Sequence, residues 1–182
     1  MAKQLVRAYE SHELTENEQK DISNARARAV NQAWRQERAY VMEGKGTRDW
    51  TPEQQEDIIK NGRLHGYEGH HMRSISNGET YEQKMEIAED KNNIQFLEKT
   101  SENNEHLKAH NGSTRNRTNG CYNAESGRTR DFGSDSPCPP KAKELSEPVA
   151  QKERDSHVDQ YGVDMSKAEK KTEQSKSIGK TK

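Results

Sequence analysis

The sequence contains few apolar residues. Leu, Ile, Val and Phe together account for 21 of its 182 residues. That fraction is well below the level of about 20% under which chains often fail to fold. This scarcity disfavours one large core, and we expect a small ordered part with long polar flanks. A core of that size usually needs a metal or disulfide cross-link to be stable.

Cysteine is equally scarce. Cys121 and Cys138 are the two cysteines of the chain, and neither belongs to a CxxC pair. Both also lie outside the segments that carry helical or strand periodicity, which disfavours structural zinc on sulfur. If a metal cross-link is present, we expect histidine to supply its ligands.

Long hydrophobic runs are absent as well. No apolar stretch approaches the ~18 residues that a membrane span requires. The start, "MAKQLVRAYESHE", lacks the apolar segment of a signal peptide. We therefore expect no membrane span and a chain that is soluble and cytoplasmic at synthesis. Secretion or delivery into a target cell by a specialised system stays open.

No sign of charge dominates, since 30 basic residues face 31 acidic ones. The local distribution is less even. Residues 24–48 contain six Lys or Arg and two Glu, and residues 106–130 contain five and one. These two basic islands are compatible with phosphate contacts. Each island alone is equally compatible with a solvated helix face.

Capping motifs predict two helices in the first third of the chain. The capping box "TENE" (Thr15, Glu18) begins a helix that runs to Gly44. Its narrow apolar stripe should pack on another element and consists of Ile22, Ala25, Ala29, Ala33 and Trp34. The second helix has Thr51 as N-cap, Pro52 as first residue, Gln54 as the reciprocal cap and Gly62 as the stop.

Shorter elements follow. "RLHGYEGHHMRSIS" predicts a strand, and residues 77–91 form a polar insert with room for one helical turn. "NNIQFLEK" predicts a strand with Ile94 and Phe96 on one face. "TSENNEHLKAHNG" predicts a helix capped by Thr100 or Ser101 and closed by Gly112. Residues 121–182 lack a face to bury, so we expect them to be mostly disordered.

Histidine spacing carries the chemistry. "EHLKAH" places His106 and His110 four residues apart, on one face of a helix, which is a spacing found in metal sites. An isolated pair of this kind is also found as two exposed histidines. The metal-site interpretation is favoured here because the pair follows "YEGHHM" and "NNIQFL" in this order.

These segments resemble the HNH endonuclease superfamily with its treble-clef-like ββα-metal fold. The resemblance is to the double-histidine (GHH) branch, which includes colicin DNases and the C-terminal toxin domains of bacterial polymorphic and Rhs-type effectors. It covers about residues 46–112, from "GTRDW" to "EHLKAHNG". It implies an α+β fold in which residues 1–45 form a helical extension, 46–120 the nuclease core and 121–182 a tail.

Matched by position, the resemblance implies that His70, His106 and His110 bind one divalent metal ion and that His71 is the general base. Asn93 would hold the hairpin loop and orient that base. Glu68 is expected to orient phosphate or a ligand, the other possibility being a plain exposed Glu. Arg115, Arg73 and Arg117 are candidate phosphate ligands. Arg115 is favoured because its segment, "HNGSTRN", continues directly from the last expected metal ligand.

The chemistry is consistent with these roles. Phosphodiester hydrolysis needs an activated water and a positive centre for the charge that develops on the leaving oxygen. An imidazole with a pKa near ~6.5 suits the first task. Three histidine ligands leave open positions on a metal. Imidazoles bind Zn²⁺, Ni²⁺ or Mn²⁺ more tightly than Mg²⁺, although the ion used in a cell can be any of these.

We therefore expect a metal-dependent endonuclease that acts on DNA with little sequence preference. The motif also admits RNA. Resemblance to toxin domains suggests a bacterial effector with an immunity protein as partner. The alternative is a non-catalytic, zinc-stabilised module that binds nucleic acid or protein. Retention of His71, which metal binding does not need, favours the nuclease.

Overall fold

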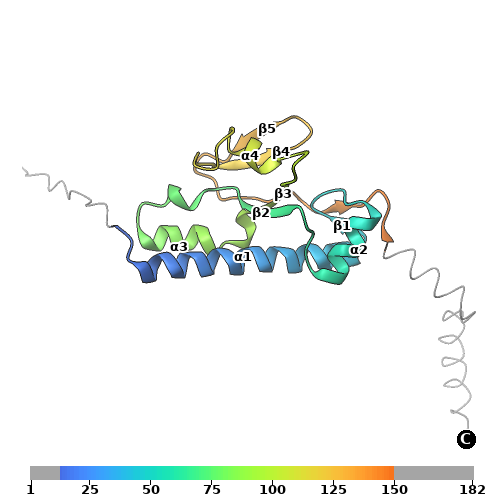
Figure 1. Ribbon diagram of the computed structural model, residues 1–182, viewed down its shortest axis with the longest axis horizontal. Coiled ribbons are helices and arrows are strands. Elements are labelled where there is room, and N and C mark those ends of the chain that lie inside the picture. Colours follow the sequence, from blue (N-terminus) through green and yellow to red (C-terminus); the bar gives the residue numbers. More distant parts are fainter. Residues whose placement is uncertain (1–12, 150–182) are drawn as a thin grey trace, which may run out of the picture.

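The computed structural model describes residues 13–149, and Figure 1 traces them. The fold is α+β, as expected. Its helices are α1 (Glu16–Met42), α2 (Pro52–Asn61), α3 (Tyr81–Glu89) and α4 (Glu105–Ala109), with 3₁₀ turns η1 (Ile75–Asn77) and η2 (Lys91–Asn93). The strands are β1 (Lys45–Gly46), β2 (Tyr67–His71), β3 (Ile94–Glu98), β4 (Gly120–Asn123), β5 (Arg128–Asp131) and β6 (Lys143–Glu144).

Helix α1 is the support on which the other elements lie (Figure 1). The capping box of Thr15 and Glu18 starts it, as predicted from the sequence. The predicted apolar stripe is buried along its length. Its N-terminal half packs on α3, where Ile22 and Ala25 meet Ala88, and its middle packs under the β2–β3 hairpin, where the rings of Trp34 and Phe96 are 3.9 Å apart.

Helix α2 also follows the prediction. Thr51 and Gln54 form its capping box and Pro52 is its first residue. Gly62 ends the helix with φ +72°, a left-handed conformation that glycine adopts without a Cβ penalty. Local signals were sufficient here because each of them acts within one helical turn.

Strands β2 and β3 form an antiparallel hairpin in which His70 pairs with Gln95 and His71 with Ile94. The connection between them holds α3, nine residues long, where the sequence suggested a single turn. The missed signal is a third capping box, Thr80 with Gln83. Tertiary packing supplies the rest, because Ala88 is fully buried against α1.

Helix α4 begins later than predicted. Its N-cap is Asn104, whose side chain accepts a hydrogen bond from the Leu107 amide at 2.8 Å. The Thr100 hydroxyl is used instead in the preceding turn, where it bonds Glu98 and Asn103. Gly112, with φ +83°, follows the helix as expected, and its amide donates to the Leu107 carbonyl.

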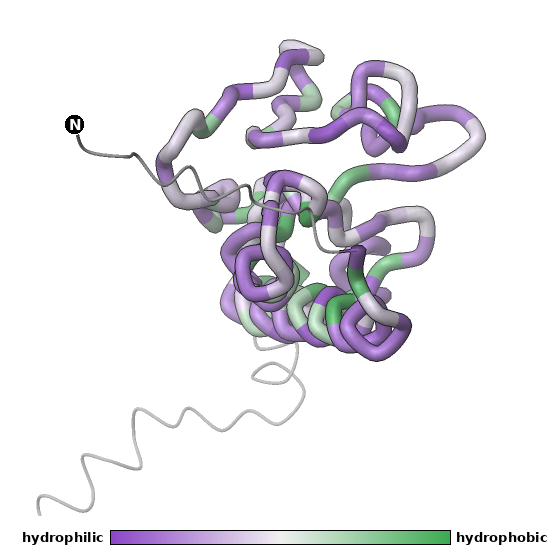
Figure 2. Tube along the Cα trace, turned by 90° about the vertical axis from the view of Figure 1, so that its left-hand side faces the viewer, coloured by the Kyte–Doolittle hydropathy of each residue, from purple (hydrophilic) through white to green (hydrophobic). Residues whose placement is uncertain are grey.

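The expected disorder after residue 120 is wrong for residues 121–149. Strands β4 and β5 form a second antiparallel hairpin, and β6 pairs with β1. Tyr122, Phe132 and Leu145 are buried, each 7% exposed or less. Figure 2 shows that apolar positions are scattered along a mostly hydrophilic chain. Leu145 and Tyr122 are buried in clusters with residues that are distant in the sequence. Residues 150–182 lie outside the described part.

Within residues 13–149, no helix has the length and apolar character needed to cross a membrane.

Candidate metal centre

Three histidines expected as metal ligands come together in the structure. His70 lies on β2, His106 on α4, and His110 directly after α4. Their ring centroids are 4.9 to 5.2 Å apart. One nitrogen from each ring can be chosen so that all three lie within 4.8 Å of one another. Three nitrogens this close together could bind one shared cation.

The hydrogen bonding of these rings fits a metal. The Nε2 of His70 and the Nδ1 of His106 are buried and have no hydrogen-bond partner. Buried polar atoms without partners are rare because they lose their hydration. The Nδ1 of His110 lies 2.7 Å from the Asn116 carbonyl, which leaves its Nε2 lone pair free. Such an outer contact typically fixes the orientation of a metal-binding imidazole.

Electrostatics keeps the rings in the form that binds metal. Burial, together with the neighbouring imidazoles, lowers the pKa of His70 to about 3. Burial also lowers the pKa of His106, against the opposing effect of Glu68. Both rings are therefore neutral near pH 7, as metal ligands must be.

His71 faces the opposite side of the hairpin from His70. Its cross-strand partner is Ile94, on the face that packs on α1, whereas Gln95 opposite His70 bonds the backbone of Tyr122 at the other face. The Nε2 of His71 lies 3.0 Å from the Ala88 carbonyl, and its Nδ1 is buried without a partner. A neutral ring that donates from Nε2 keeps a lone pair on Nδ1. Burial lowers the pKa of His71, so the ring is neutral at pH 7.

Asn93 holds the end of β2 and the end of α3 together through hydrogen bonds to their backbones. It is fully buried, and its side-chain oxygen accepts from the Arg73 amide at 2.7 Å. Its side-chain nitrogen donates to the carbonyls of Arg73 and Ile87 at 2.9 and 3.3 Å. The residue after Ile87 is Ala88, whose carbonyl holds His71. Asn93 therefore links the end of β2 to the end of α3, beside the partner of His71.

Gly69, which precedes the histidine pair, has a steric role. A Cβ at this position would lie 2.8 Å from the Cγ1 of Val30 on α1 and 3.2 Å from the Cγ2 of Ile94. Real Cβ atoms do not approach that closely, and valine is stiff about χ1. The glycine lets β2 lie directly on α1, which sets the height of both histidines above the helix.

A cavity of about 330 Å³ opens over the histidines. All four side chains line it, together with Glu68, Ser74, Arg115 and Arg26 among others. Glu68 is half-exposed, pairs with Lys99 at 2.6 Å, and lies 4.0 Å from the Nδ1 of His106. The cavity thus combines four imidazoles, one carboxylate and two exposed guanidinium groups.

A comparison with protein families matches residues 4–98 to Tox-GHH, described as a GHH signature containing HNH/Endo VII superfamily nuclease toxin. The chain belongs to this family. The matched residues include Gly69, His70, His71 and Asn93, and end before α4. The pairing of the family signature with His106 and His110 therefore comes from the geometry rather than from the match.

The Tox-GHH chain is also similar to short parts of several large proteins. It is 39% identical to Teneurin-1 of Mus musculus over 77 residues, which is 42% of this chain and 3% of the relative. It is 34% identical to Teneurin-3 of Danio rerio over 85 residues, and 32% identical to Teneurin-m of Drosophila melanogaster over 76 residues. The chain spans about 3% of the length of these relatives.

Two of the three arginines that we expected to bind phosphate do not line the histidine cavity. The guanidinium of Arg73 donates to the Asn119 side chain at 2.7 Å and to the carbonyls of Gly133 and Asp135. It therefore fastens the segment after β5, and it does not line the histidine cavity. Arg117 is exposed and is likewise not among the cavity residues. Arg115 alone of the three lines the cavity.

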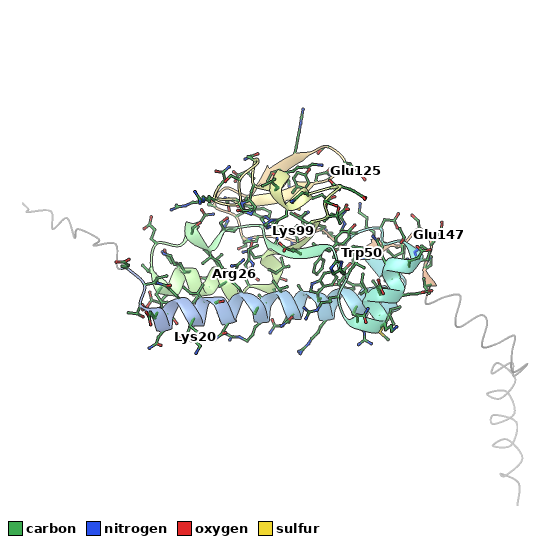
Figure 3. The ribbon with its side chains drawn as sticks, viewed as in Figure 1. Lys20, Arg26, Trp50, Lys99, Glu125 and Glu147 are labelled. Atoms are coloured by element: carbon green, nitrogen blue, oxygen red, sulfur yellow. The ribbon has the colours of Figure 1, made fainter. Side chains whose placement is uncertain are left out.

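Arg26 is the cavity residue that the motif did not indicate. It lies on α1, between the helix and the hairpin (Figure 3). It is far in sequence from the histidines, so a motif centred on them does not reach it. A helical signal was available, because Arg26 precedes Val30 by four residues and therefore shares the face on which Gly69 lies.

Proposed function

We propose that this chain is a metal-dependent endonuclease that hydrolyses phosphodiester bonds, with DNA as substrate and little sequence preference. The observation that carries the proposal is the state of His71. This ring lies beside the three clustered histidines, is held from behind at Nε2, and offers an unpartnered Nδ1. A site that served only to hold a metal would not need this fourth, oriented imidazole.

In the proposed mechanism, His71 accepts a proton at Nδ1 from the attacking water. The Ala88 carbonyl fixes the tautomer, and Asn93 fixes the loop that carries Ala88. Such an oriented general base typically contributes about 10² to 10⁴-fold in rate. Neutral His71 is ready to act at pH 7 because burial lowers its pKa.

His70, His106 and His110 would hold one divalent cation, Zn²⁺, Mg²⁺, Mn²⁺ or Ni²⁺. When bound, this cation would supply a positive centre for the charge that develops on the leaving oxygen. Arg115 and Arg26 line the same cavity and would bind the non-bridging phosphate oxygens. Glu68, which pairs with Lys99, lies 4.0 Å from the Nδ1 of His106 and would place a carboxylate beside the bound cation and the phosphate.

The biological role that fits the family is a toxin delivered into a target cell, with an immunity protein that covers the histidine cavity in the producing cell. Family membership supports the toxin role, and the open cavity supports the choice of surface. An RNA substrate and a zinc-stabilised binding module without activity are the alternatives that the following test separates.

The test is cleavage of supercoiled plasmid DNA and of a structured RNA by the purified chain, with each of the four metals added in turn. His71→Ala should reduce cleavage by at least about 10²-fold, as removal of a general base does. His65→Ala is the matched control, because His65 is exposed and lies outside the cavity. A parent protein that binds metal and leaves both nucleic acids intact would instead identify a binding module.

A further inference from the structure

Helix α4 carries His106 and is followed directly by His110, yet it is only five residues long. Isolated helices shorter than about 12 residues are marginal in water, so tertiary contacts must orient this one. Its apolar support is small, because Ala109 packs only in a cluster with Leu97 and Tyr122. Another contact must therefore fix its N-terminal end.

That contact is made by Glu105, the first residue of α4. Its side chain is buried, and its carboxylate receives two hydrogen bonds from Arg48, at 2.8 and 3.1 Å. The same carboxylate accepts a third bond from the Glu98 amide at the end of β3, at 2.9 Å. A two-pronged arginine–carboxylate pair fixes direction as well as distance.

Arg48 is itself anchored to both strands of the hairpin. Its Nη1 donates to the Phe96 carbonyl on β3 at 3.2 Å. Its guanidinium lies 5.2 Å from the ring centre of Tyr67 on β2, a cation–π distance. The pair therefore connects the hairpin that carries His70 to the first residue of the helix that carries His106.

We propose that Arg48 and Glu105 are a positioning pair for the metal centre. They set the orientation of α4 on the hairpin and so hold His106 and His110 where His70 can share a cation with them. This inference rests on the proposed metal centre. A pair that only stabilised the fold would change the melting temperature and leave the metal affinity of the folded protein unchanged.

The experiment measures Zn²⁺ affinity of the full chain with a competing chelator, at a temperature where each metal-free variant is folded. Glu105→Gln keeps the side-chain length and loses the charged pair, and Arg48→Lys keeps the charge and loses the second hydrogen bond. Each should weaken Zn²⁺ binding by about tenfold or more, the usual effect of removing contacts behind metal ligands.

Glu37→Gln is the matched control. Glu37 is also a buried carboxylate, and it bonds Thr47 and Trp50 on either side of Arg48 without touching α4. This variant should lower the melting temperature and keep the parent's Zn²⁺ affinity. The double variant Arg48→Lys with Glu105→Gln should bind Zn²⁺ only slightly less tightly than the single variant that has the lower affinity. The two losses should not add, because both changes break the same pair.

Unchanged Zn²⁺ affinity in Glu105→Gln and Arg48→Lys would overturn the inference and leave the metal centre standing. Equal weakening by Glu37→Gln would overturn it too, because affinity would then follow general stability. A parent chain that does not bind Zn²⁺ would overturn the proposed metal centre, and the positioning pair with it.

Discussion

The two faces of strand β3 meet different surroundings. Ile94 and Phe96 point toward α1 and join a cluster of ten buried apolar residues that includes Trp34 and Trp50. Leu97 points the other way, toward α4, and its buried cluster contains only Ala109 and Tyr122 besides itself. We refer to these as the α1 face and the α4 face of the hairpin. Figure 1 shows the hairpin between the two layers.

This difference indicates how each layer is held. The α1 face is held mainly by apolar burial, with aromatic rings packed in tilted pairs. The α4 face depends on polar contacts, namely the Arg48–Glu105 pair, the Gln95 bonds to the Tyr122 backbone, and the converging histidines. The candidate metal centre thus lies in the layer with less apolar support, where a bound cation would add the most stability.

The largest effect is expected on the α1 face. Trp34→Ala removes a buried ring and should reduce the free energy of unfolding by about 3 to 5 kcal/mol. The loss should be the same with and without chelator, because Trp34 does not touch the metal centre. Denaturant unfolding in both conditions measures it. Leu107→Ala on α4 is the control, since Leu107 is 37% exposed and should cost little. An equal cost for both changes would contradict the contrast between the faces.

A smaller effect is expected where β2 lies on α1. Gly69→Ala forces a methyl group against Val30 and should destabilise the fold by about 1 to 3 kcal/mol, as overpacking does. Val30→Ala makes room, so the double variant should be more stable than the two single losses predict. Thermal denaturation of the four proteins gives this coupling. If Gly69→Ala is as stable as the parent, the close approach of strand and helix is not what requires glycine.

The smallest effect is a pH dependence of the chelated protein. Burial lowers the pKa of His70 to about 3, below the value of about 6.5 for the unfolded chain. Below that unfolded value the unfolded state binds the extra proton, so stability is complete above pH ~6.5 and falls as the pH decreases. The slope should be about 1.4 kcal/mol per pH unit for His70, and His71 and His106, whose pKa values burial also lowers, add to it in the same direction.

Denaturant unfolding at several pH values from 7.5 down to 5.5 measures this slope. That window keeps carboxylate titration small. His70→Gln should make the dependence shallower, because glutamine does not titrate and only the other buried histidines then contribute. A chelated parent whose stability is constant over the window would show that the buried rings are not held neutral.

Local sequence signals predicted the elements that depend on local contacts. Thr15 with Glu18 and Thr51 with Gln54 defined α1 and α2 because a capping box is complete within four residues. Asn104 replaced Thr100 as the cap of α4 because the Thr100 hydroxyl has other partners. The strands after residue 120 were missed because Tyr122 and Leu145 are buried by residues distant in the sequence.

In the candidate site, too, some residues were predictable from the sequence and others depend on contacts between distant segments. The resemblance to the double-histidine nucleases implied that His70, His106 and His110 share one site, and the structure brings these three side chains together. Their roles as ligands, and that of His71 as base, remain predictions. The Arg48–Glu105 pair was missed because the two residues are 57 positions apart and no local pattern records such a pair. Arg26 was missed because it lies on α1, far in sequence from the histidine motif, although its spacing from Val30 was a usable signal.

Zn²⁺ binding by the parent, His110→Ala and His71→Ala proteins tests the central claim most directly, because it separates the three clustered histidines from their neighbour. The account predicts one ion per parent chain, affinity within about tenfold of the parent for His71→Ala, which lies outside the ligand set, and loss of binding for His110→Ala. Retained binding in His110→Ala, or loss in His71→Ala, would contradict the three-histidine centre.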